Sequence, residues 1–119
     1  MSISNHLYGD PYVKTTEGQT KFEKIISAYG KTSMKDVLVS KLLELLKDGN
    51  LKNDDVYDDE DTDVTDKIFV NFPNYGTRTH TIILVDDNNK VYYEEHTLSF
   101  PVDTTSPSWT SQNYEFDLI

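Results

Sequence analysis

Residues 74–86 decide the fold; they read Asn-Tyr-Gly-Thr-Arg-Thr-His-Thr-Ile-Ile-Leu-Val-Asp. The last part of this stretch, residues 82–85, is an uninterrupted run of four apolar residues, three of which are β-branched. That length is typical of a strand, and the absence of alternation predicts that both faces of the strand are buried. We therefore expect a central strand in a layered fold.

Arg78 lies just before this strand and is the only arginine of the chain. The nearby Gly76 allows a backbone turn that a Cβ atom would hinder. A single guanidinium at the mouth of a central strand is a candidate for binding a carboxylate or another anion in a forked geometry. The alternative is a structural arginine that pairs with a buried carboxylate or caps carbonyl groups, because ion-pair networks resemble functional sites.

The same stretch carries a resemblance to a known family. Residues 75–86, with the later Trp109 and residues 114–116, resemble the C-terminal part of the transport-and-Golgi-organisation-protein-two family, also named for an Asn-Arg-Asp-Glu string. The similarity begins almost at residue 1, and nothing corresponds to the family's first half, including its initial Met-Cys and the Asn-Arg-Asp-Glu string. We therefore expect a fragment, or a gene product that keeps only the C-terminal half.

The composition limits the function classes that fit. The 119 residues suffice for a single domain with a modest core, which the resemblance makes the C-terminal half of a larger hydrolase-like fold. Cysteine is absent, which excludes disulfides and thiolate chemistry within this sequence. We expect no membrane span, no signal peptide at the N-terminus and, without a basic patch, no nucleic-acid binding.

The net charge of −10 is unevenly distributed. Residues 53–66 contain eight acidic residues and no basic one, and removing these eight charges leaves −2 for the rest of the chain. Blocks of like charge repel one another, so we expect an acidic mobile loop at residues 53–66. Calcium binding is the alternative, although the segment lacks the central glycine and the closing glutamate of an EF-hand loop.

Two helices are predicted in the first half of the chain. For the first helix, Thr16 and Gln19 fit a capping box, an apolar stripe follows, and Gly30 marks the end. For the second helix, Ser33 and Asp36 mark the start. The polar stripe of this helix consists of Asp36, Ser40, Glu44 and Lys47. The remaining apolar arc is wide, which predicts packing against a sheet and against the first helix.

Four strands are predicted after the helices. Residues 68–72 and the apolar run form the first two, and residues 87–89 make a hairpin turn without glycine, because asparagine enters the left-handed region cheaply. Residues 91–98 return as a partner strand, and residues 113–118 alternate as a half-buried strand. Two helices followed by a four-stranded, mainly antiparallel sheet indicate the α+β class, with the helices on one face.

The resemblance implies an N-terminal-nucleophile hydrolase-like fold, in which two stacked sheets lie between two helical layers. One face of the sheet would then meet the helices and the other a second sheet, built largely by the half that this chain lacks. In that superfamily the first residue after processing is the nucleophile and its α-amine is the base. The family's candidate cysteine has no counterpart here, and the resemblance places Ser2 in mid-chain, so we assign no catalytic residue.

The candidate ligand-binding residues follow from the same resemblance. They are Asn5, Tyr75, Gly76, Thr77 and Arg78. Related acylases use an asparagine at a similar strand end as an oxyanion-hole donor, which is the role implied for Asn5; the alternative is an asparagine that satisfies turn backbone. Arg78 would face the same cleft.

We assign no metal site and no cofactor. His80 departs from the family pattern, and His6 and His96 are isolated residues without ligand-like spacing. Haem as a ligand is implied by the resemblance alone, and neither an axial ligand nor an apolar slot can be assigned for it.

Three functions remain open. The first is a C-terminal half that acts in Golgi organisation and protein secretion, with haem or lipid handling also implied by the resemblance. The second is a fragment of a cysteine-dependent amide or thioester hydrolase, and the third is a small acidic binding module. The expected partners are the missing N-terminal half or a self-association partner, and a small anionic ligand. The expected location is cytoplasmic, with Golgi or mitochondrial association implied by the family.

Overall fold

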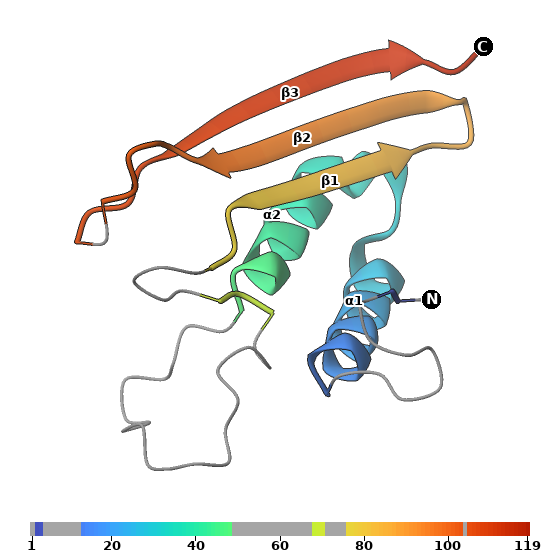
Figure 1. Cartoon of the computed structure of the whole chain (residues 1–119). Coiled ribbons are helices and arrows are strands. Elements are labelled where there is room, and N and C mark those ends of the chain that lie inside the picture. Colours follow the sequence, from blue (N-terminus) through green and yellow to red (C-terminus); the bar gives the residue numbers. More distant parts are fainter. Residues whose placement is uncertain (1, 4–12, 49–67, 71–75, 104) are drawn as a thin grey trace. The chain divides into compact units, whose positions relative to one another are not determined.

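The computed structural model describes residues 2–3, 13–48, 68–70, 76–103 and 105–119 (Figure 1). The described elements are α1 (Val13–Tyr29), the short 3-10 helix η1 (Thr32–Met34), α2 (Lys35–Leu46), β1 (Thr79–Val85), β2 (Lys90–Leu98) and β3 (Trp109–Asp117). They fall into two compact units, Met1–Asn71 and Phe72–Ile119. The α+β class is confirmed: the first unit contributes two helices and the second an antiparallel sheet.

Helix α1 begins earlier than its capping signal predicts. The helix already starts at Val13, and the carbonyl of Thr16 accepts a hydrogen bond from the Thr20 hydroxyl at 3.1 Å, so Thr16 lies inside the helix. The predicted capping box at Thr16 and Gln19 is therefore wrong, because the residues before it continue the helix. The predicted end is right: the helix ends at Tyr29, and the amide of Gly30 donates to the Ile26 carbonyl at 2.8 Å.

Helix α2 follows the predicted pattern closely. The 3-10 turn precedes it and Met34 occupies the N-cap position without a side-chain capping bond, so the start lies within two residues of the expected Ser33. Its buried residues are Leu38, Val39 and Leu42, and the predicted polar stripe is exposed along its whole length. Figure 1 shows α1 and α2 side by side, running in opposite directions, as expected for helices joined by a short turn.

The β1–β2 hairpin forms as predicted at residues 87–89. Asn89 takes a φ of 60°, the left-handed conformation that asparagine tolerates. The Asp86 carboxylate accepts bonds from the amides of Asn88 and Lys90, both at 2.9 Å. The Asp86 amide also donates to the Lys90 carbonyl at 3.0 Å. The turn therefore needs no glycine: Asn89 adopts the left-handed conformation, and the Asp86 side chain holds the turn.

The sheet has three strands in the order β1-β2-β3, with antiparallel pairing throughout. The first of the four predicted strands, at residues 68–72, is not observed: residues 68–70 are not in a strand, and residues 71–72 lie outside the described residues. The strand β3 starts four residues before the predicted position at Asn113. The acidic segment at residues 53–66 also lies outside the described residues, so its predicted mobility stays a prediction.

The apolar run of β1 is buried on one face only. Ile82 is 4% exposed, whereas Ile83 and Val85 are 60% and 56% exposed. Within the described residues β1 therefore has one open face and lies at an edge of the three-stranded sheet. Burial of both faces stays a prediction, because the second face was expected to meet a sheet built largely outside this sequence. A run of apolar residues indicates that both faces can be buried, but the second face also needs a partner layer to cover it.

The register gives the sheet two different faces. One face, called the tyrosine face here, is defined by Thr79, Thr81, Ile83, Val85, Val91, Tyr93, Glu95, Thr97, Thr110, Gln112, Tyr114 and Phe116. The other, called the histidine face, is defined by His80, Ile82, Glu94, His96, Leu98, Trp109, Ser111 and Asn113. On the tyrosine face Tyr114 and Phe116 are 55% and 52% exposed, so the predicted half-buried last strand is open to solvent.

Gly18 and Gly30, at two positions along the helical unit, predict opposite effects of an added methyl group. A Cβ at Gly30 would lie 2.4 Å from the Ile26 carbonyl oxygen, so Gly30→Ala should lower the free energy of unfolding by about 1–3 kcal/mol. A Cβ at Gly18, inside α1, would meet Ile68 Cδ1 at an ordinary 3.5 Å. Gly18→Ala should therefore raise stability by up to about 1 kcal/mol through helix propensity. Urea unfolding checks both, and equal effects would contradict this geometry.

Candidate functional site

Arg78 is held in place by its backbone and by an aromatic ring. Its carbonyl accepts a hydrogen bond from the Leu98 amide at 2.8 Å, which ties the start of β1 to the end of β2. Its guanidinium carbon lies 3.8 Å from the centroid of the Phe100 ring, a cation–π contact. The side chain is exposed, and no carboxylate within the described residues forms an ion pair with it. The guanidinium edge is therefore open to an anion from outside these residues.

Two histidines from different strands meet next to Arg78. His80 on β1 lies directly opposite His96 on β2 in the register. The bond from the Leu98 amide to the Arg78 carbonyl extends this register by one residue, so alternation places Arg78 on the same histidine face. His80 is 3% exposed and stacks on Trp109 of β3, with ring centroids 5.2 Å apart and an interplanar angle of 19°. The end of the histidine face thus combines a cation, two imidazoles and an indole.

Glu94 and His96 leave hydrogen-bonding capacity unused within the described residues. His96 Nε2 lies 3.5 Å from Glu94 Oε1, close enough for an ion pair when the imidazole is protonated. Neither His96 Nε2 nor Glu94 Oε2 has a hydrogen-bond partner among the described residues, although both atoms are buried. Buried polar atoms of this kind are typical of positions that bind a water molecule or a ligand.

The predicted site residues are placed only in part. Gly76 and Thr77 are half-buried and precede Arg78 directly, so three of the five expected residues share one segment. Asn5 and Tyr75 lie outside the described residues, and the implied oxyanion role of Asn5 stays a prediction. Within the described part of the chain, no group of three His, Cys, Asp or Glu residues lies close enough to hold a metal ion.

The pairing of His80 with His96 was missed at the sequence level. Sequence reasoning set His80 aside because it departs from the family pattern and His96 because it is isolated, and sixteen positions separate the two. The signal was nevertheless present: the turn at residues 87–89 fixes which residues of the two strands face each other. Counting outward from that turn places the two histidines opposite one another.

The tyrosine face carries a hydrogen-bonded network at its polar end. The Tyr93 hydroxyl donates to Glu95 Oε2 at 2.6 Å, and the Thr97 hydroxyl donates to Glu95 Oε1 at 3.1 Å. The hydrogen bond to Glu95 raises the pKa of Tyr93 above its ordinary value, and desolvation of the phenol adds to the shift. Tyr93 also lies beside Tyr114, at 6.1 Å between ring centroids. This network orders one half of the face.

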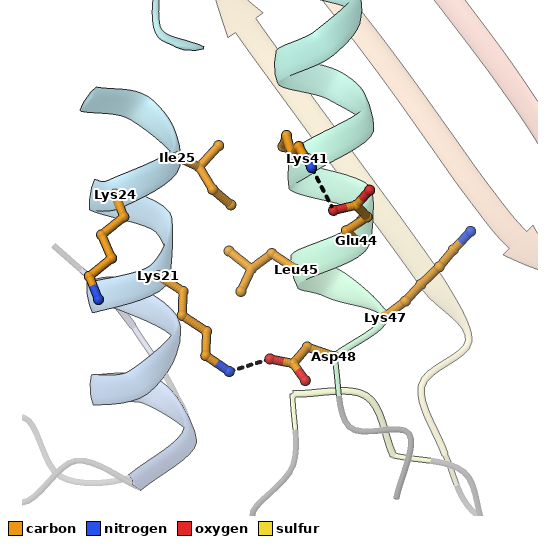
Figure 2. A pocket seen from close by; sticks show the side chains of 8 residues that line it. All are labelled: Lys21, Lys24, Ile25, Lys41, Glu44, Leu45, Lys47 and Asp48. Atoms are coloured by element: carbon orange, nitrogen blue, oxygen red, sulfur yellow. Dashed lines mark hydrogen bonds and ion pairs between the residues drawn. The ribbon is translucent and has the colours of Figure 1, made fainter. Parts of the chain in front are cut away.

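A groove of about 400 Å³ lies between the two helices (Figure 2). Lys21 of α1 bonds to Asp48 after α2, which raises the pKa of Lys21, and Lys41 pairs with Glu44 at 3.3 Å. Figure 2 shows Ile25 and Leu45 directed toward one another across the groove. The remaining lysines, Lys24 and Lys47, point away from the space between the helices. Apolar and ionic contacts therefore join the two helices across the groove. The lysines that line it do not point toward a common position where a ligand could bind.

Comparison with known proteins finds similarity over a region that includes Arg78 and the first two strands. Residues 1–99, which contain Arg78, β1 and β2, match the family described as Transport and Golgi organisation 2. The chain belongs to this family. The resemblance noted in the sequence is thereby confirmed over most of the chain, and β3 lies beyond the residues that the family description matches.

Curated relatives from three animals extend the match. The chain is 32% identical to the Transport and Golgi organization 2 homolog of Mus musculus and 30% identical to the homolog of Homo sapiens, in both cases over 98% of this chain. The Drosophila melanogaster protein is 30% identical over 82% of this chain. The chain spans 44% of the two mammalian proteins and 36% of the fly protein, and it matches their C-terminal region. None of the described helices is long and apolar enough to cross a membrane.

The Tyr93–Glu95 bond predicts a specific pH dependence. Because the pKa of Tyr93 is raised in the folded state, the stabilisation by its neutral phenol is complete below pH about 10 and is lost as pH rises through the raised value. Replacing Glu95 with Gln should return the Tyr93 pKa toward its ordinary value. NMR titration of ring-labelled tyrosine checks this, with Gln112→Ala as a control that leaves Glu95 intact. An unchanged Tyr93 titration in Glu95→Gln would contradict the assignment.

Proposed function

We propose that this chain acts in Golgi organisation and protein secretion as a binding unit, in which Arg78 holds an anionic group of a ligand. The observation that carries the proposal is the exposed guanidinium of Arg78, which stacks on Phe100 and has no ion pair within the described residues. The family description supplies the cellular process. The geometry supplies the chemistry, because an open guanidinium binds carboxylates and phosphates in a forked arrangement.

The aromatic contact explains why the site suits binding. Stacking on Phe100 restrains the plane of the guanidinium, so less conformational entropy is lost when an anion approaches its edge. Haem and phospholipids both carry the anions that such a fork recognises, as propionates and phosphates respectively. The handling of haem or lipid implied by the family resemblance would therefore begin at Arg78.

The exposed tyrosine face supports a second part of the same proposal. Ile83, Val85, Tyr114 and Phe116 are each more than half exposed on this face. Exposed apolar side chains that gather on one face mark an interaction site. We propose that a second sheet from the part of the family fold outside this match covers the face, which gives the layered, N-terminal-nucleophile hydrolase-like sandwich.

Catalysis is not part of the proposal for this sequence alone. It contains no cysteine, so the family's candidate nucleophile is not supplied by these residues. The hydrolase alternative concerns a longer protein, in which Asn5 and Arg78 would form part of the cleft. Cysteine-dependent turnover by such a protein would separate that alternative from a purely binding role.

The anion-binding proposal is tested by changing the fork while keeping the charge. Arg78→Lys should weaken binding of pyrophosphate, a probe for the anion site, by about tenfold, because one charge-assisted hydrogen bond is lost. NMR titration of backbone amides measures the affinity. The control is Lys90→Ala, which removes an exposed cation at the other end of the sheet, where Lys90 pairs with Asp117. Unchanged binding together with lower stability would make Arg78 a structural arginine.

The proposed docking face is tested by a hydrophobic dye. The chain should bind the dye, and the double variant Ile83→Thr and Phe116→Thr should bind it at least severalfold less, because both residues are exposed and lie on the tyrosine face. Thr110→Ser is the matched control on the same face. Equal dye binding by all three proteins would contradict the face as the docking surface.

A further inference from the structure

The strand β3 presents an open edge. It is the outermost strand in the order β1-β2-β3, and no strand within the described residues pairs with its other side (Figure 1). Every residue of β3 after Trp109 is exposed. A long, exposed edge strand is a template for pairing with another strand. The edge concerns the backbone of β3, whereas the docking face proposed above concerns side chains.

The hydrogen bonds at both ends of β3 determine which backbone groups point outward. The Ser99 amide donates to the Ser108 carbonyl at 2.7 Å, and the Leu118 amide donates to the Asn89 carbonyl at 2.8 Å. In an antiparallel pair, residues alternate between bonding to the neighbour and pointing away from it. Even-numbered residues of β3 therefore bond to β2, and odd-numbered residues, with Asn113 in the middle, direct their N–H and C=O groups outward.

We propose that two copies of this chain pair edge to edge through β3, antiparallel and with the two-fold axis at Asn113. Asn113 is the midpoint of Trp109–Asp117, so this register uses the full length of the strand. All the outward N–H and C=O groups of both copies then meet a partner. Two sheets become one continuous sheet, and the tyrosine faces of the two copies lie on the same side.

The full length of the strand centres this register on Asn113, and the charges of β3 disfavour registers centred nearer its C-terminal end. With the axis at Asn113, Glu115 lies opposite Ser111 of the second copy, and Asp117 lies opposite Trp109 of the second copy. An axis at Glu115 would instead place two glutamates opposite each other, and an axis at Phe116 would place Asp117 opposite Glu115. Like charges directly opposite destabilise a pair of strands. Asp117 is in addition paired with Lys90 at 3.0 Å, which reduces its repulsion.

The other edge of the sheet is a weaker candidate. The strand β1 alternates between buried and exposed residues, and Gly76 just before it already takes part in a β-bridge. Parallel, in-register pairing of β3 is also disfavoured, because it would set each acidic residue beside its own copy and would not close. The antiparallel β3 pair is the arrangement that is closed, full-length and free of opposed acids.

The proposal is tested on the whole chain by measuring its mass in solution over a range of concentrations. A dimer is expected, and Asn113→Pro should raise its dissociation constant at least tenfold, because proline removes an outward N–H while all bonds from β3 to β2 remain. Asn113→Ala keeps the N–H and should dimerise like the original chain. A chain that stays monomeric at high concentration would overturn the proposal, as would a dimer unaffected by Asn113→Pro.

A second variant tests the register itself. Asn113→Asp replaces the side-chain amide with a carboxylate of nearly the same shape and places two carboxylates opposite each other on the two-fold axis. Dimerisation should therefore weaken at neutral pH and recover below pH about 4, where the carboxylates are protonated. Ile83→Thr changes the tyrosine face on the far strand β1 and should leave the dimer intact. If Ile83→Thr disrupts the dimer and Asn113→Asp does not, the copies meet through the face and the edge proposal is wrong.

Discussion

The turn that joins β1 to β2 sets the register on which the rest of the sheet depends. The Asp86 carboxylate accepts bonds from the amides of Asn88 and Lys90, and Asn89 closes the turn at a φ of 60°. A slip of one residue would move every side chain of β2 to the opposite face. His96 would then no longer face His80, and Tyr93 would leave the exposed apolar face. The candidate site and the docking face therefore both follow from one hydrogen-bonded turn.

Local interactions made much of the fold predictable. The end of α1 at Gly30, the stripes of α2 and the turn at residues 87–89 depend on neighbours in sequence, and all three are observed. Predictions that depended on partners outside the described residues are not tested by these residues. Four consecutive apolar residues in β1 indicated burial on both faces, but the number of layers that cover a strand is a property of the whole assembly.

In the candidate site, too, some features could be predicted from the sequence and others depend on strand pairing. Arg78 could be singled out from the sequence, because it is the only arginine and precedes an apolar strand. Its contact with Phe100 could not, since the ring is 22 positions away and reaches the guanidinium only when β2 pairs with β1. The histidine pair required the register as well. Sequence reasoning therefore identified the unusual residue, while strand pairing determined its surroundings.

The described residues bury few apolar side chains, which gives a common physical reason for the two proposed associations. The buried apolar side chains are Leu38, Val39, Leu42 and Val70 in the first unit and Ile82 and Val91 in the second, and none of the described residues is buried completely. Small cores provide little stabilisation against the conformational entropy of the chain. Covering the tyrosine face would bury large side chains such as Phe116, and pairing β3 would satisfy backbone groups that water now solvates. Association with another polypeptide surface thus adds the burial that a sheet with one open face and an open edge lacks by itself.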